Sequence, residues 1–144
     1  MKAKAKRKSA SHPNRRASDR LPTIAQYEKL YVDLIGFVPP RIKNRLRLGK
    51  EVGPEMLHLV ETIREQGMYP ASMSVKTAQM ILFGILLSHV APAAEFHGVA
   101  AKRAGASKTE LHDVAGLAFL FRGLPAFNLG AELINKIFDG KADA

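Results

Sequence analysis

Apolar residues recur at steps of three and four through most of the chain, which is the spacing of one face of an α-helix. The first such stripe consists of Ile24, Tyr27, Leu30, Tyr31, Leu34 and Ile35. Gly36 and the pair at 39–40, both prolines, follow it, and these residues commonly end a helix. No segment alternates apolar and polar residues as a half-buried strand would. The pattern therefore predicts an all-α, compact domain of about six helices.

Three segments follow in the first two thirds of the chain. Residues 41–50 form a basic segment that also holds a few apolar side chains. Pro54 begins a helix whose apolar positions are Leu57, Val60 and Ile63. Ser74 is a suitable N-cap for a helix over 75–88, whose central residues, QMILFGILL, are apolar nearly all round. We expect that helix to be buried.

The stretch AEFHGVAAKRAGASKTELHDV, residues 94–114, predicts a helix, a glycine stop and a second helix start. Gly105 closes the first of these helices. Ser107 and Glu110 form an S-x-x-E capping box that opens the next one. The G-L-P-A turn at 123–126 breaks that helix, and a last helix follows it to about Phe138.

Charge separates a tail from the rest of the chain. The sequence of 144 residues has 22 Lys or Arg and 13 Asp or Glu, for a net charge of +9, and residues 1–20 alone carry +7 of it. This tail has no apolar run, so it is not a secretory signal. We expect a disordered, solubilising tail, with weak nonspecific nucleic-acid contact as the alternative. Residues 21–144 then form one helical domain.

The chain contains no cysteine. Disulfides, thiolate nucleophiles and Cys-based zinc sites are therefore excluded. The five histidines form no H-x-x-x-H or H-E-x-x-H pair, so we expect no metal and no other cofactor. No segment is apolar for the roughly 18 residues that a membrane span needs, and we expect a cytoplasmic protein without a membrane partner.

The residues after His97 follow a recognisable order. They are Ala101, Gly105, Ala106, Ser107, Glu110, Leu111, Asp113, Gly123, Pro125 and Ala126. In this order and spacing the chain resembles the carboxymuconolactone decarboxylase family, which also contains alkylhydroperoxidase D. The segment MSVKTAQMILFGILLS resembles the helix before the histidine in that family. The resemblance covers roughly residues 37–138.

Within that family the chain resembles the Cys-less, decarboxylase-like branch. The peroxidase branch has cysteines at the positions that Val90 and Ala93 hold here, so a thiol peroxidase is excluded. The family's upstream Glu falls near Gln79, and an amide cannot relay a proton as a carboxylate does. The second His of that branch falls at Leu117.

His97 is the strongest candidate for a catalytic residue, because imidazole gains and loses protons near neutral pH. A buried core histidine bonded to the backbone is the alternative. Glu95 is the second catalytic candidate, although two residues along a helix place it about 200° from His97. Its alternative is a surface carboxylate paired with Lys102 or Arg103.

His89 and Arg122 are the candidates for substrate binding. His89 ends the apolar helix, where a histidine interacts favourably with the helix dipole, and it lies close to Glu95 in sequence. Arg122 precedes the G-L-P-A turn, and a guanidinium there is suited to clamp a substrate carboxylate. The alternative for Arg122 is a surface residue that caps its helix. His112 is expected on an exposed face.

The resemblance implies a cofactor-independent lyase, decarboxylase or isomerase with His97 as acid/base. The implied substrate is a small carboxylated lactone or a related product of aromatic breakdown. The alternative is a non-catalytic binding or scaffold member that has lost the chemistry. Members of the family assemble into trimers, hexamers or similar rings, so a homo-oligomer is also implied. The apolar surplus of residues 75–88 suits a helix that lies partly at such an interface.

Overall fold

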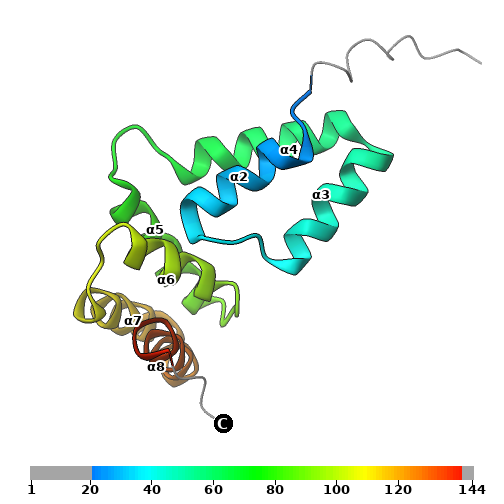
Figure 1. The fold of residues 1–144 in the computed structure, drawn as a ribbon. Helices are drawn as coiled ribbons and strands as arrows, with labels where there is room; N and C mark the ends of the chain where they lie inside the picture. The colour runs from blue at the N-terminus through cyan, green and yellow to red at the C-terminus, as the bar shows by residue number, and fades with distance from the viewer. Residues whose placement is uncertain (1–20, 141–144) are drawn as a thin grey trace, which may run out of the picture.

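The computed structural model describes residues 21–140 and has no strand in that range (Figure 1). The helices of this range are α2 (Ile24–Ile35), α3 (Pro40–Val52), α4 (Pro54–Met68), α5 (Val75–Ser88), α6 (Ala94–Arg103), α7 (Lys108–Arg122) and α8 (Leu124–Asp139). The predicted all-α fold is confirmed, with seven helices in this part of the chain in place of about six. The predicted tail, residues 1–20, lies outside the described residues.

The additional helix is α3, which the sequence pattern described only as a basic segment. Pro40 occupies its first position, where the missing N–H is not needed, and the N–H of Gly53 bonds to the Gly49 carbonyl at its end. Leu46 is its one fully buried residue, while Leu48 is exposed. Lys and Arg are so frequent in this segment that it is polar overall, which is why the pattern did not identify α3.

Local capping bonds set the ends of α5, α6 and α7 as predicted. Ser74 Oγ accepts the backbone N–H of Thr77 at 3.1 Å. The backbone N–H of Glu110 donates to Ser107 Oγ at 3.1 Å, and that of Ser107 donates to the Glu110 carboxylate at 2.8 Å. Gly105 follows α6 with φ +93°, a conformation that only glycine adopts without a steric penalty. These bonds form between near neighbours, so the sequence alone locates them.

The helices pack as two groups, which Figure 1 shows side by side. α5 to α8 enclose the larger core, in which Phe83, Leu87 and Leu111 are fully buried. The smaller group, α2 to α4, packs around Tyr27, Tyr31, Leu46 and Leu57. Side chains of both groups meet where the two cores adjoin.

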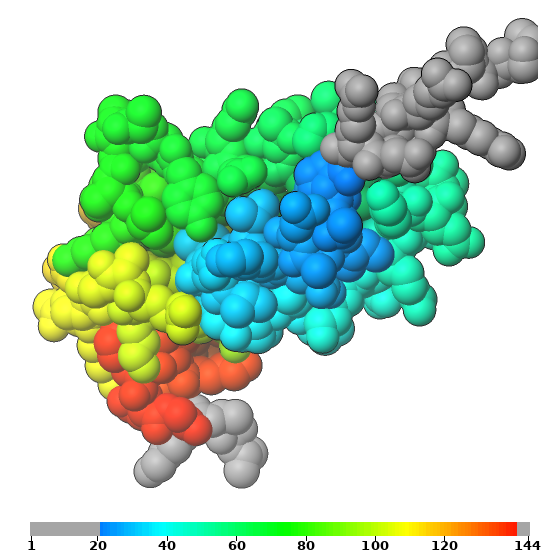
Figure 2. Space-filling view, turned by 45° about the horizontal axis from the view of Figure 1, so that its top comes forward, coloured from blue at the N-terminus to red at the C-terminus, as the bar shows by residue number. Residues whose placement is uncertain are grey.

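α2 and α6 join the two groups. Leu34 and Ile35 of α2 pack against Ala100 of α6. The space-filling view shows the blue α2 lying against the yellow-coloured end of α6 (Figure 2). On another face of α6, a Cβ at Gly98 would lie 2.6 Å from Ile137 Cδ1, so a side chain there would displace the end of Ile137 of α8. This packing fixes the orientation of α6. No helix within residues 21–140 is long and apolar enough to cross a membrane.

Candidate functional site

His97 is held by one hydrogen bond to the neighbouring helix. Its Nδ1 lies 2.8 Å from Oε1 of Gln79, which is fully buried on α5. Gln79 Nε2 in turn lies 3.8 Å from the sulfur of Met68. An amide oxygen only accepts hydrogen bonds, so Nδ1 donates and carries the proton of the neutral ring. Nε2 of His97 is then the nitrogen that is free to accept a proton.

The imidazole of His97 is uncharged at neutral pH. Burial of the ring and, to a smaller extent, the positive charge of Arg64 together lower its pKa from 6.5 to about 4. Both causes act against the imidazolium form. The ring therefore rests as a base, and once protonated it is a strong acid.

A small cavity of about 90 Å³ lies beside His97, at the junction of α2, α3, α4 and α6. Its walls are formed by Tyr31, Leu34, Ile35, Ile42, Arg45, Arg64, Met68, Phe96 and His97. Ordinary small-molecule sites enclose roughly 300 Å³ or more. The cavity therefore has room for one end of a substrate, with the remainder lying towards solvent.

A buried ionic cluster borders this cavity. Glu61 is only 1% exposed, and both of its carboxylate oxygens accept hydrogen bonds. Arg45 Nη2 donates to Oε1 at 2.6 Å, while Arg64 Nε and the Tyr31 hydroxyl donate to Oε2 at 3.2 and 2.8 Å. Arg45 Nη2 also donates to the Tyr31 hydroxyl at 2.5 Å. Two guanidinium groups thus share one carboxylate, which leaves the cluster with one surplus positive charge.

Tyr31 acts as a hydrogen-bond donor in this cluster. Burial and, next in size, the hydrogen bond to Glu61 raise the pKa of its phenol to about 12. The guanidinium of Arg64 lies 3.7 Å above the centroid of the Tyr31 ring, a favourable cation–π contact. The phenol therefore stays protonated at neutral pH, and its ring fixes the position of Arg64.

Sequence reasoning missed this cluster because it followed the wrong face of α4. Val60 and Ile63 were expected on the apolar face of the helix, but both are exposed, and Ile63 is 69% exposed. The inward face instead carries Leu57, Glu61, Arg64 and Met68. These four residues follow one another at steps of four, three and four, as residues on one face of a helix do. The signal in the sequence was therefore the acid Glu61 and the base Arg64 on the same helix face as Leu57.

Glu95 does not reach the cavity at His97. Its carboxylate accepts a hydrogen bond from Lys136 Nζ of α8 at 2.9 Å, in place of the expected Lys102 or Arg103. This placement follows from the helix angle between Glu95 and His97. A catalytic role for Glu95 stays a prediction.

His89 and Arg122 are both exposed, and neither lines the cavity at His97. His89 forms the C-terminal cap of α5, and Arg122 is the last residue of α7. Substrate binding by these two residues stays a prediction. His112 is exposed as expected, with its ring 5.4 Å from that of Phe127 between centroids.

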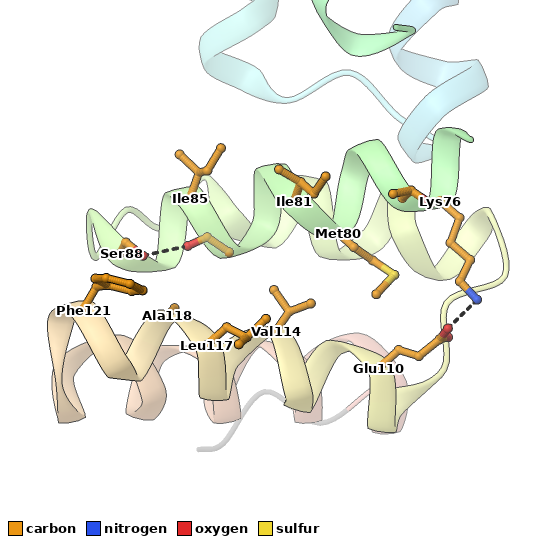
Figure 3. Close-up of a pocket in the computed structure, with 12 residues that line it drawn as sticks. Lys76, Met80, Ile81, Ile85, Ser88, Glu110, Val114, Leu117, Ala118 and Phe121 are labelled. Carbon is orange, nitrogen blue, oxygen red and sulfur yellow. Dashed lines mark hydrogen bonds and ion pairs between the residues drawn. The ribbon is translucent and has the colours of Figure 1, made fainter. Parts of the chain in front are cut away.

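A larger groove of about 430 Å³ runs between α5 and α7 (Figure 3). Apolar side chains form most of it, and Ile81 and Ile85 stay half exposed on the helix that we expected to be buried. Lys76 and Glu110 close one end through an ion pair of 2.6 Å. The bond to Lys76, and that to Ser107, lower the pKa of Glu110 to about 2. Because its charged groups are already paired, this groove is a poorer place for proton transfer than the cavity at His97.

The comparisons with known proteins bear on residues of both helix groups. Residues 54–136, more than half of the chain, match the sequence model described as the carboxymuconolactone decarboxylase family. No curated protein and no solved structure matches the chain. The match includes Gln79 and His97, whereas Tyr31 and Arg45 precede it. The absence of cysteine is consistent with a Cys-less branch. The chain belongs to the carboxymuconolactone decarboxylase family.

Proposed function

We propose that the protein is a cofactor-independent lyase, decarboxylase or isomerase in which His97 is the acid/base. Its substrate is a small carboxylated lactone or a related product of aromatic breakdown. Family membership supports the reaction class. The observation that carries the assignment is the uncharged imidazole of His97, which borders a cavity with a surplus positive charge.

The proposed isomerisation or decarboxylation requires a group that takes a proton from a substrate carbon or gives one to it. In an isomerisation, Nε2 of His97 accepts a proton from one substrate carbon, and the imidazolium returns it to another. In a decarboxylation, the departing CO₂ leaves its electron pair on the substrate as an enolate, and the carbon is protonated by a proton that Nε2 of His97 takes from water and passes on. Gln79 holds the ring through Nδ1 but takes up no charge, so it is a positioning residue.

A turnover assay with one matched pair of variants tests this proposal. Carboxylated lactones are offered to the full chain, and CO₂ release and the ultraviolet absorbance of the lactone are followed. His97→Gln should lower kcat by about 100-fold or more, the usual loss when a general acid/base is removed. His112→Gln should retain the full rate, because His112 is exposed and distant in the fold.

Two results would contradict the proposal. The first is a wild-type chain that turns over no carboxylated lactone of the panel. The second is a His97→Gln variant that matches the wild type on a substrate that is turned over. The first result would leave a non-catalytic binding member of the family as the remaining function.

We also propose that the protein is a homo-oligomer. The support is the row of exposed apolar side chains along the groove between α5 and α7, which includes Ile81, Ile85, Leu117 and Phe121. Phe121 lies beside Ser88 at the far end of that groove from Lys76 (Figure 3). Contiguous apolar surface of this kind is typical of protein–protein contacts.

A further inference from the structure

We propose that Arg45 and Arg64 form a receiving site for the carboxylate of a small organic acid at the mouth of the His97 cavity. The ligand is a short monocarboxylate or the carboxylate end of a larger substrate. The identity of that substrate rests on the proposed function, whereas the binding of the carboxylate does not.

The cluster of Arg45, Glu61 and Arg64 has a net positive charge. Glu61 neutralises one of the two guanidinium groups, and the surplus positive charge lies beside the cavity. In the half-buried surroundings of this junction, such a charge attracts an anion more strongly than it would in water. His97 is uncharged and adds no competing charge of either sign.

Both guanidinium groups have nitrogens that can donate further hydrogen bonds to a ligand. Within residues 21–140, Nε and Nη1 of Arg45 and both Nη atoms of Arg64 make no hydrogen bond. No buried side-chain nitrogen or oxygen lacks a partner in the same range, so the free nitrogens of Arg64 are open to solvent. A planar guanidinium with free donors pairs with a carboxylate in bidentate fashion.

The two arginines differ in exposure. The Arg64 side chain is 15% exposed, and its guanidinium lies over the ring of Tyr31, so it has little room to turn. The Arg45 side chain is 44% exposed and extends from α3 into the mouth of the cavity. Arg45 can therefore turn towards an arriving anion while Arg64 and Tyr31 keep Glu61 paired. A cavity of about 90 Å³ limits the bound part to a carboxylate and a few carbons.

Part of the proposed site lies outside the residues that match the family model. Tyr31 and Arg45 lie on α2 and α3, which precede the matched residues 54–136. Helices α2 and α3 therefore supply Tyr31 and the more exposed Arg45, whereas Arg64 lies on α4, within the matched residues. A carboxylate bound here would also offset the charge of Arg64, one of the causes that lower the pKa of His97. Binding would therefore make His97 a better base at the moment when substrate is present.

The test titrates acetate into the full chain at pH 7, where acetate is ionised, and follows the ¹⁵N signals of the His97 ring and of the arginine side chains. Acetate should shift these signals in a saturable manner, because the bound carboxylate pairs with the guanidinium groups beside the ring. Sodium chloride at the same ionic strength is the control for general screening. Arg45→Gln should weaken acetate binding at least tenfold. Arg41→Gln, an exposed position on the same helix, should leave it unchanged.

Glu61→Gln separates a binding site from a purely structural cluster. Without the carboxylate, both guanidinium groups are available, so acetate should bind several-fold more tightly even though the variant is less stable. Arg45→Lys keeps the charge, and it should retain more affinity than Arg45→Gln. Equal effects of acetate and chloride would overturn the proposal, as would equal affinities in Arg45→Gln and Arg41→Gln.

The acetate titration and the turnover assay distinguish the failure of one proposal from the failure of the other. Saturable acetate binding without turnover of any lactone would contradict the proposed function and leave the carboxylate site in place. Turnover that depends on His97, with no acetate effect and an unchanged KM in Arg45→Gln, would contradict the carboxylate site alone.

Discussion

His97 couples the stability of the fold to pH. Its pKa is about 4 in the folded chain, against 6.5 for an unperturbed histidine. Between these values the unfolded chain binds a proton that the folded chain does not, so stability decreases as the pH falls. The free energy of unfolding should be at its full value above pH 6.5 and should drop by about 2 kcal/mol on approaching pH 4.5. Urea unfolding at a series of pH values measures this drop.

Histidine variants provide the control for that experiment. His97→Gln should remove most of the pH dependence between about pH 7 and 4.5, since no buried imidazole is left to titrate. His112→Gln should keep it, because that residue is exposed. Unfolding that is equally pH-dependent in the wild type and in His97→Gln would show that another group is responsible.

The side chain at position 79 sets which charge faces the His97 ring. A carboxylate at this fully buried position would face the ring at the 2.8 Å of the present hydrogen bond and would favour the imidazolium. Gln79→Glu should therefore raise the pKa of His97 by more than one unit. The ¹⁵N signals of the ring measure this shift. Gln79→Met, which has a similar volume and no charge, should leave the pKa low. A pKa that is the same in both variants would contradict this role of Gln79.

At the scale of the elements, the turn between α5 and α6 is strained at Val90. Its φ is +51°, and a β-branched residue in this left-handed region is disfavoured by about 1–2 kcal/mol. Two backbone bonds hold the turn, from Val90 N to Leu87 O at 2.8 Å and from Ala91 N to Leu86 O at 2.9 Å.

Replacement of Val90 by glycine and by alanine measures this strain. Both changes remove the apolar side chain, but only glycine adopts the positive φ without a penalty. Val90→Gly should therefore be more stable than Val90→Ala by about 1 kcal/mol, the reverse of the usual order of these two residues. Thermal and urea unfolding give the difference. If Val90→Ala is the more stable variant, the turn does not hold this φ in solution.

The elements also show which parts of the fold the sequence predicts. The ends of α5, α6 and α7 follow from bonds between near neighbours, as at Ser74, Gly105 and Ser107, and these were predicted. The buried face of α4 was not, because its centre is Glu61, a residue that is normally exposed. A carboxylate is buried only when tertiary partners neutralise it, and the partners of Glu61 come from three helices.

At the scale of the whole molecule, the candidate site lies where the two helix groups meet. His97 belongs to the larger group, whereas Tyr31, Arg45 and Arg64 belong to the smaller one. The family spacing predicted His97 because its motif is continuous along the chain. It did not predict the arginines, because they reach the cavity only through the packing of α2 against α6. The chemistry of the site thus depends on how the groups dock.

Two exposed aliphatic residues on opposite groups provide a test of the proposed association between copies. Leu117 on α7 is 63% exposed beside the α5–α7 groove, and Ile63 on α4 is 69% exposed. An aspartate at either position costs little within one chain, but it disfavours an apolar contact between chains. Leu117→Asp should reduce the mass measured by light scattering to that of a single chain, and Ile63→Asp should leave the oligomer intact. The opposite pattern would place the interface on α4, and a wild-type chain that is already monomeric would contradict the proposed oligomer.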